Sequence, residues 1–238
     1  MSKASQIFFQ FKQFTIAHDK CAMKVNTDGV LLGAWQVVND VNNILDIGTG
    51  SGVIALMMAQ KYSHALIDAV EIDEGAYLQA KQNFSESKWA TRLKVSHCAL
   101  QNLISDKKYD LIISNPPYFI DDFVSSNPRK NVAKHNLLLT YDDLVASIGW
   151  LMTEEGRALL VIPAFNFEKI KAIGIVQKLF INKLTEVRAV TTKKPYVILL
   201  ELGKKQMPMI KDSIEIQNID GTFTERYKDL TKDFYLKF

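Results

Sequence analysis

Asn43-Ile44-Leu45-Asp46-Ile47-Gly48-Thr49-Gly50-Ser51-Gly52 is a short apolar run followed by alternating glycines. The run predicts a buried strand, and a helix is expected to begin near Val53. Glycine lets the backbone turn tightly and approach a ligand that a Cβ would repel. The dinucleotide fingerprint would need glycine where Val53 stands, and a phosphate loop would need Gly-Lys-Ser/Thr, so neither pattern is met. A strand, a tight turn open to a ligand, and a helix are predicted here.

Glu71 stands at the end of the next predicted strand, Leu66 to Val70, about 20 residues after the last glycine. In a β-α-β unit, an acid at this spacing accepts hydrogen bonds from the hydroxyl groups of a ribose. Acids also occupy strand ends for structural reasons, so a structural role stays open for Glu71 as well.

A third strand is predicted at Leu93-Lys94-Val95, and a further strand, from Tyr109 to Ile113, stops at two prolines within Ser114-Asn115-Pro116-Pro117-Tyr118-Phe119. Proline cannot donate to a strand ladder, so the chain must turn outward at the carboxyl end of the sheet, where α/β proteins bind ligands. The two fixed φ angles hold the Asn115 amide, the Pro116 carbonyl and the Tyr118 ring at set angles. Most Pro-Pro pairs only punctuate loops, but these neighbours predict a small preorganised site.

The rest of the chain alternates predicted helices and strands, which indicates an α/β fold. Thr27 or Asp28 is expected to cap one helix, and Asp142-Asp143 another. A turn at Glu155-Gly156 should precede a strand from Ala158 to Ile162. The segments Phe180–Val190 and Tyr196–Leu202 are expected to form an adjacent antiparallel pair. One domain over residues 1–238 is expected, with an N-terminal segment (1–40), a core (41–203) and a C-terminal appendage (204–238).

Composition narrows the class of protein. The chain has 238 residues, a net charge of +3 and two cysteines. It has neither a signal-type apolar region nor a long uncharged apolar run, so a cytoplasmic protein without membrane spans is expected. Cys21 and Cys98 lack metal-ligand spacing, so reduced thiols and no metal are expected. The small net charge neither requires nor excludes nucleic acid. No pattern specifies an oligomeric state, and a monomer is favoured.

Two segments have unusual composition. Phe8, Phe9, Phe11 and Phe14 lie among Gln and Lys, including Lys12. Packing on the core is favoured for at least half of these rings, with stacking on nucleic-acid bases as the alternative. Residues 121–136 show little periodicity, and a loop of that length is usually functional. It is interpreted as a lid or substrate-binding loop.

The order of strand, glycine loop, helix, strand with Glu71, and Asn-Pro-Pro-Tyr turn resembles class I S-adenosylmethionine-dependent methyltransferases that methylate amino groups. Over nearly its whole length the chain further resembles the bacterial tRNA1(Val) adenine-N6 methyltransferases. The segments that carry this second resemblance are Phe11–Phe14, Ala17–Asp19, Ala22–Val25, Thr27–Gly29, Leu32–Trp35, Asp46–Gly50, Asn115–Phe119 and Leu230–Tyr235.

The resemblance implies a Rossmann-like fold with a mostly parallel seven-stranded sheet, one antiparallel strand and helices on both faces. It implies S-adenosyl-L-methionine as cofactor and the adenine immediately 3′ of the anticodon in tRNA1(Val) as substrate. Glu71 would bind the ribose, and related enzymes often place an Asp where Cys98-Ala99 stand, so the contacts to the cofactor adenine are not specified. The other implied cofactor contacts are Asp46, Gly48, Gly50 and Gly52, with the turn that holds Lys24, Thr27 and Asp28 over the methionine end.

The exocyclic amine of adenine is a poor nucleophile because its lone pair is delocalised into the ring. If Asn115 Oδ1 and the Pro116 carbonyl each accept one N–H, the lone pair points at the methyl group and the developing charge is stabilised. Pro117 fixes this turn, and Tyr118 is expected to stack on an adenine turned out of the anticodon loop. Further substrate contacts are expected from Phe119, Arg129, Lys134, His135 and Lys12.

Other functions share these features. A protein-glutamine N5 methyltransferase or another nucleic-acid amino-methyltransferase uses the same turn, although those enzymes normally carry a separate recognition domain that the roughly 45 residues before the glycine loop cannot supply. A non-catalytic RNA-binding module is the alternative from another class. It would have no use for Asn115, Gly48 and Glu71 together.

Overall fold

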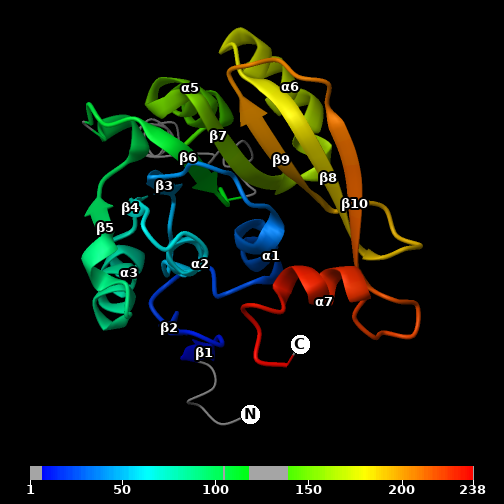
Figure 1. The fold of residues 1–238 in the computed structure, drawn as a ribbon, viewed down its shortest axis with the longest axis horizontal. Helices are drawn as coiled ribbons and strands as arrows, with labels where there is room; N and C mark the ends of the chain where they lie inside the picture. The colour runs from blue at the N-terminus through cyan, green and yellow to red at the C-terminus, as the bar shows by residue number, and fades with distance from the viewer. Residues whose placement is uncertain (1–6, 104, 118–138, 238) are drawn as a thin grey trace, which may run out of the picture.

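An eight-stranded sheet forms the centre of the computed structural model, which describes residues 7–103, 105–117 and 139–237 (Figure 1). The strand order is β10-β8-β9-β7-β6-β3-β4-β5. The strands are β3 (Asn43–Ile47), β4 (Leu66–Glu71), β5 (Leu93–His97), β6 (Tyr109–Ser114), β7 (Met152–Pro163), β8 (Phe180–Val190), β9 (Val197–Gly203) and β10 (Ile210–Gln217). A separate hairpin pairs β1 (Phe8–Gln10) with β2 (Thr15–Ala17).

The pairing confirms a mostly parallel sheet. Strand β9 runs antiparallel to both β7 and β8, and the other neighbouring pairs are parallel. The antiparallel pair β8–β9 was therefore predicted correctly. The predicted count of seven strands is wrong by one, because β10 extends the sheet by pairing in parallel with β8.

Helices cover both faces of the sheet (Figure 1). One core cluster contains residues of α1, α2, α3 and α7, and the other contains residues of α5 and α6. Strand residues alternate between the clusters, with Leu111 and Ile113 in the first and Ile112 in the second. Burial on both faces explains the continuous apolar runs of the central strands. The helices are α1 (Thr27–Trp35), α2 (Val53–Lys61), α3 (Glu74–Glu86), α5 (Tyr141–Leu151), α6 (Phe167–Val176) and α7 (Glu225–Thr231).

Helix caps and one turn differ from the predictions. Asn26, rather than Thr27 or Asp28, caps α1, and its Oδ1 accepts the Gly29 N–H at 2.9 Å. Thr140 caps α5, with Asp143 completing a capping box one turn into the helix. Glu155 and Gly156 lie within strand β7, at an irregularity where the pairing with β6 shifts from Tyr109–Met152 to Leu111–Arg157. A Cβ at Gly156 would lie 2.6 Å from Met152 Cγ and 3.0 Å from the Tyr109 carbonyl oxygen, so this glycine serves close packing against β6.

The two ends of the described chain pack together through aromatic rings. Phe11 is 1% exposed and stacks on Phe14 and Tyr235, with ring centroids 4.6 and 6.0 Å apart. The Lys12 N–H donates to the Phe234 carbonyl at 2.8 Å. The core-packing interpretation therefore holds for Phe11 and Phe14, whereas Phe8 is 50% exposed.

Lys61, at the end of α2, closes the carboxyl end of α1. Its Nζ donates to the carbonyl oxygens of Gly33, Ala34 and Gln36 at 3.1, 3.3 and 2.7 Å. A cation at a helix carboxyl end satisfies unpaired carbonyls and opposes the helix dipole. Burial lowers the pKa of Lys61 to about 8, so the ammonium is still mostly charged at neutral pH.

Replacing this ammonium should destabilise the protein. Lys61→Met keeps most of the side-chain volume but leaves the α1 carbonyls without their donor, and we expect it to lower the free energy of unfolding by about 1–3 kcal/mol in urea titrations. Lys81→Met, at an exposed position of α3, is the matched control and should change it by less than about 0.5 kcal/mol. Equal stability of the two variants would contradict the capping role.

Candidate active site

A cavity of about 340 Å³ opens at the carboxyl edge of the sheet. Its walls are the glycine loop after β3, the end of β4, residues 98–101 after β5, the turn after β6, and residues 21–23 ahead of α1. Small-molecule sites typically measure about 300–1,000 Å³. The carboxyl ends of parallel strands are also where α/β sheets bind their ligands. The cavity therefore has the size and the place of a ligand site.

The glycine loop presents bare backbone to the cavity. Gly48 and Gly50 have φ values of 69° and 55°, and a Cβ at either position would meet nothing within 4 Å. Gly52, with a φ of 87°, lies behind the loop, where a Cβ would be 2.5 Å from the Phe84 ring. Gly48 and Gly50 thus leave room for a ligand, while Gly52 allows the loop to pack on α3.

Glu71 joins the glycine loop to the start of α3. Its Oε2 accepts the Gly50 N–H at 2.8 Å, and its Oε1 accepts the N–H groups of Ile72 and Asp73 at 2.8 and 2.9 Å. Each carboxylate oxygen can accept more than one hydrogen bond. Glu71 therefore orders the loop and still offers acceptor capacity to a ligand in the cavity that it lines.

Asp46 lies beneath the loop and is fully buried. Its Oδ2 accepts the Thr49 hydroxyl at 2.6 Å, and its Oδ1 makes no hydrogen bond among the described residues. Burial raises the pKa of Asp46 to about 7, so the carboxyl group is partly protonated at neutral pH. In this position Asp46 supports the loop from behind the cavity wall.

The turn after β6 brings Asn115 to the cavity. The Ser114 hydroxyl donates to the Ile47 carbonyl at 2.8 Å and ties the end of β6 to β3. Asn115 Oδ1 is buried and has no hydrogen-bond partner in the described part of the chain. Leaving a buried acceptor unpaired costs about 1–3 kcal/mol. Native proteins rarely carry such groups without a reason, so the atom marks a place for a donor that the described residues do not supply.

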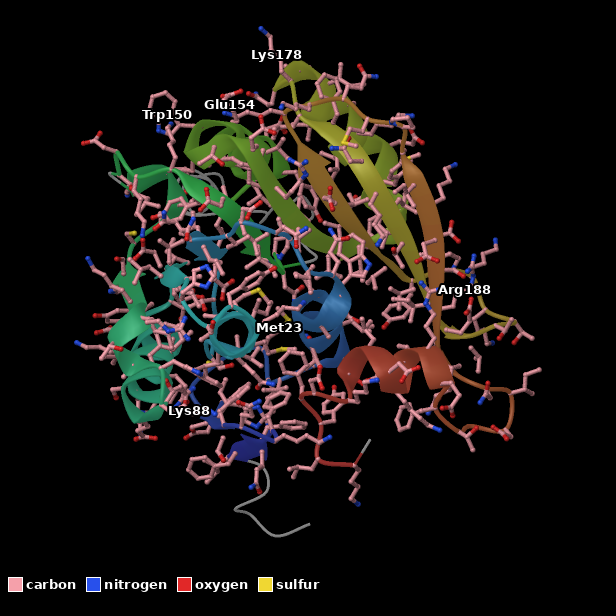
Figure 2. The ribbon with its side chains drawn as sticks, viewed as in Figure 1. Met23, Lys88, Trp150, Glu154, Lys178 and Arg188 are labelled. Carbon is pink, nitrogen blue, oxygen red and sulfur yellow. The ribbon has the colours of Figure 1, made fainter. Side chains whose placement is uncertain are left out.

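Residues 18–25, which we call the covering segment, close the cavity on its remaining side (Figure 2 labels Met23). Buried side chains hold this segment at both ends. Asn83 of α3 accepts the Ala17 N–H at 3.0 Å and donates to the Ala17 and Ser51 carbonyls at 2.8 Å each. His18 Nδ1 accepts the Val25 N–H at 3.0 Å. Asn83 thereby links α3 to the glycine loop and to Ala17, the residue directly ahead of the covering segment.

The candidate residues fall into three groups. Those that line the cavity are Gly48, Gly50, Glu71, Asn115 and Pro117. Those described outside its lining are Lys12, Lys24, Thr27, Asp28, Asp46, Gly52 and Pro116. Those outside the described residues are Tyr118, Phe119, Arg129, Lys134 and His135.

Two of the candidate residues outside the cavity lining, Lys12 and Asp28, make hydrogen bonds elsewhere in the protein. Lys12 donates through Nζ to the Lys232 carbonyl at 2.6 Å. Asp28 Oδ1 accepts the Tyr196 hydroxyl at 2.8 Å, in the first turn of α1. The next residue, Gly29, is close to Asn115, because a Cβ there would lie 3.5 Å from Asn115 Nδ2. The first turn of α1 is therefore beside the Asn115 amide.

Sequence reasoning missed much of the cavity wall. Cys21, Met23 and Gln101 line the cavity. None of these residues stands in a strand-end or glycine pattern that could have identified it as a lining residue. Cys98 and Ala99 line the wall after β5. Burial, with Glu71 and Asp73 nearby, raises the pKa of Cys21 to about 11, and burial also raises the pKa of Cys98. Both thiols are therefore neutral and weakly polar surfaces at physiological pH.

The described residues contain no cluster of His, Cys, Asp and Glu that could hold a metal ion. They also form no helix with the length and apolar character needed to span a bilayer.

Known proteins are similar to this chain over most of its length. The methyltransferase small domain family matches residues 29–199. A tRNA1(Val) (adenine(37)-N6)-methyltransferase of Trichodesmium erythraeum is 42% identical, with 97% of this chain and 98% of the relative covered. The protein of the same name from Parabacteroides distasonis is 41% identical, again over 97% and 98% of the two chains.

Solved structures share the fold. A "predicted O-methyltransferase" from Agrobacterium tumefaciens matches with a TM-score of 0.69 and 15% identity, covering 87% of this chain and 96% of that one. A TehB-like SAM-dependent methyltransferase from Corynebacterium glutamicum matches with a TM-score of 0.51 and 18% identity, covering 77% and 90%. The chain therefore has the Rossmann-like α/β fold predicted from its sequence.

Loosening the covering segment should weaken ligand binding. Asn83→Leu removes the hydrogen bonds to Ala17 and Ser51, and we expect about tenfold weaker binding of S-adenosylhomocysteine in calorimetric titrations. Asn83→Asp keeps one acceptor and should lie between Asn83→Leu and the native protein. Gln82→Leu, an exposed neighbour on α3, is the control. The thermal unfolding temperature of Asn83→Leu should be measured as well. If this variant unfolds at the native temperature and still binds S-adenosylhomocysteine with native affinity, the anchoring role of Asn83 is refuted.

Proposed function

The chain belongs to the methyltransferase small domain family and, within it, to the tRNA1(Val) (adenine(37)-N6)-methyltransferases, and we propose that it methylates N6 of the adenine immediately 3′ of the anticodon in tRNA1(Val). S-adenosyl-L-methionine is the methyl donor. The single observation that carries the proposal is Asn115 Oδ1, a buried acceptor without a partner among the described residues, at the wall of a cavity lined by Gly48, Gly50 and Glu71.

The cavity fits the donor in size and chemistry. Bare backbone at Gly48 and Gly50 gives room for close approach, and Glu71 has acceptor capacity for the ribose hydroxyls. Residues 98–101 would face the adenine ring of the cofactor, and the covering segment would lie over the methionine end of the cofactor. When bound, S-adenosyl-L-methionine supplies an electrophilic methyl group on a positively charged sulfur.

Asn115 acts on the acceptor nitrogen. Its Oδ1 and the Pro116 carbonyl would each accept one N–H of the adenine amine, which turns the lone pair of N6 toward the methyl group. Positive charge develops on N6 as the carbon–nitrogen bond forms and the carbon–sulfur bond breaks. Two acceptors that are already in place stabilise this charge without reorganisation. Alignment of the amine with the methyl group supplies a further part of the rate.

Proton removal needs no strong base. After transfer, N6 carries an extra proton, and an aromatic ammonium of this kind releases it readily to water. A neutral Asn at this position agrees with that requirement, because a base would serve no purpose there. Tyr118 would hold the flipped adenine by stacking.

The full-length similarity to relatives named for tRNA favours this activity over the protein-glutamine methyltransferase considered from the sequence. The tRNA anticodon loop is accordingly the proposed partner. We place the enzyme in the cytoplasm, where tRNA is modified, and a monomer is the oligomeric state that we favour.

Removing the Asn115 amide should separate binding from chemistry. We expect Asn115→Ala to lower kcat for methylation of unmodified tRNA1(Val) by about 10²–10³, the usual cost of one preplaced hydrogen-bonding group. The affinity for S-adenosylhomocysteine should stay within about twofold, because the side chain contacts the acceptor rather than the cofactor. Undiminished kcat in this variant would overturn the assignment of Asn115.

Glu71 can be tested by comparing ligands. If Glu71 accepts the ribose hydroxyls, Glu71→Ala should weaken binding of S-adenosylhomocysteine by more than tenfold, on the order of two lost charge-assisted hydrogen bonds. An analogue without the two ribose hydroxyls should lose less affinity in the variant than S-adenosylhomocysteine does. Equal losses for both ligands would show that Glu71 acts only by ordering the glycine loop.

A further inference from the structure

The carboxyl edge of the sheet continues past Asn115 over the ends of β7, β9 and β8, away from the cofactor cavity. The 3-10 turn η4 (Ala164–Asn166) follows β7, and residues 191–196 connect β8 to β9. The Ala164 N–H donates to the Tyr196 carbonyl at 3.1 Å, so these two connections lie side by side.

This part of the edge exposes aromatic rings. Phe165 is 80% exposed, which makes it the most exposed phenylalanine among the described residues. Tyr196 is 40% exposed, and its hydroxyl donates to Asp28, which fixes the ring. Burying a ring of this size is favourable, so a ring left in water at the edge of an active site is available to a partner.

The same surface carries free positive charge. Lys193 and Lys194 are exposed at the tip of the β8–β9 connection, and neither forms an ion pair with a carboxylate in the described part of the chain. Arg188, farther back on β8, differs, since its guanidinium pairs with Glu186 and Glu215. The two ammonium groups therefore keep their charge for an external anion.

A chain of contacts places this surface next to the catalytic amide. Tyr196 binds Asp28 in the first turn of α1, and the next residue, Gly29, approaches Asn115 Nδ2. The cofactor cavity lies on the β3–β4–β5 side of Asn115, and the exposed rings and lysines lie on the β7–β9–β8 side. A substrate whose reacting group enters at Asn115 would extend over this second side.

We propose that Phe165, Tyr196, Lys193 and Lys194 form an RNA contact surface, on which a base next to the target adenine stacks and the lysines bind neighbouring phosphates. The assignment rests on the proposed function. Single-stranded loops are recognised in this way, since every base has a stacking face and every nucleotide carries a phosphate. Phosphate contacts set the register of the RNA, and stacking holds the loop open.

Removing the two charges should change the salt dependence of binding. We expect Lys193→Ala/Lys194→Ala to weaken binding of unmodified tRNA1(Val) about tenfold and to lower the slope of log affinity against log salt by about 1.4 between about 50 and 200 mM, or about 0.7 per lost phosphate contact. The control is Lys94→Ala/Lys211→Ala, which removes two exposed lysines near the amino ends of β5 and β10. Its slope should equal that of the native protein.

Removing the ring should act differently. We expect Phe165→Ala to weaken tRNA binding about tenfold with an unchanged salt slope, because stacking releases no counterions. Val176→Ala is the control, at a position 77% exposed at the end of α6. Val176 comes shortly before Lys178 in the sequence, and Figure 2 shows Lys178 and Arg188 near opposite ends of β8. The control position is therefore at the other end of β8 from the β8–β9 connection. In both test variants KM for tRNA should rise while the affinity for S-adenosylhomocysteine stays native.

The outcomes separate this inference from the proposed function. If the native protein binds and methylates tRNA but both test variants match their controls, the contact surface is refuted and the proposed function stands. If the native protein neither binds nor methylates tRNA, both are refuted. A lower salt slope in the lysine variant, together with weaker binding at the native salt slope in Phe165→Ala, would support the surface.

Discussion

The carboxylate of Glu71 is the interaction on which the active site depends. It accepts backbone N–H groups from Gly50, Ile72 and Asp73, so one side chain fixes both the glycine loop and the entry to α3. Asn83 of α3 then binds Ser51 in the same loop and Ala17 ahead of the covering segment. Two side chains, Glu71 and Asn83, therefore hold the glycine loop against α3 from two successive residues, Gly50 and Ser51.

Much of the fold was predictable because its signals are local. Both strand-and-turn units, at Asn43–Gly52 and at Tyr109–Pro117, combine an apolar run with residues that force a turn, and both lie at one edge of a parallel sheet. Strand β10 gives no such signal. Its sequence, Ile210–Gln217, is half exposed and rich in charge, as suits a strand at the edge of a sheet. Its place depends on pairing with β8.

The cavity lining could be predicted only where a residue stands in a glycine, strand-end or proline-turn pattern. Gly48, Gly50, Glu71 and Asn115 are of this kind. The covering segment is different, because Cys21 and Met23 line the cavity in a stretch that Asn83 and Gln79 of α3 hold by accepting the N–H groups of Ala17 and Lys20. Lys12 shows the same limit: its ammonium group donates to the Lys232 carbonyl, which no sequence pattern indicates, and its contact with RNA stays a prediction. Long-range side-chain partners of this sort leave no periodic trace in a sequence.

The packing of Phe11 on Tyr235 has a consequence for synthesis of the chain. The hairpin β1–β2 leads directly into the covering segment, and the hairpin rests on residues 234 and 235. The ribosome synthesises a chain from the amino end to the carboxyl end, so the hairpin is made long before residues 234 and 235. The hairpin can therefore take up this packing only after Phe234 and Tyr235 have been synthesised, so the first strands of the chain are among the last to find their partners.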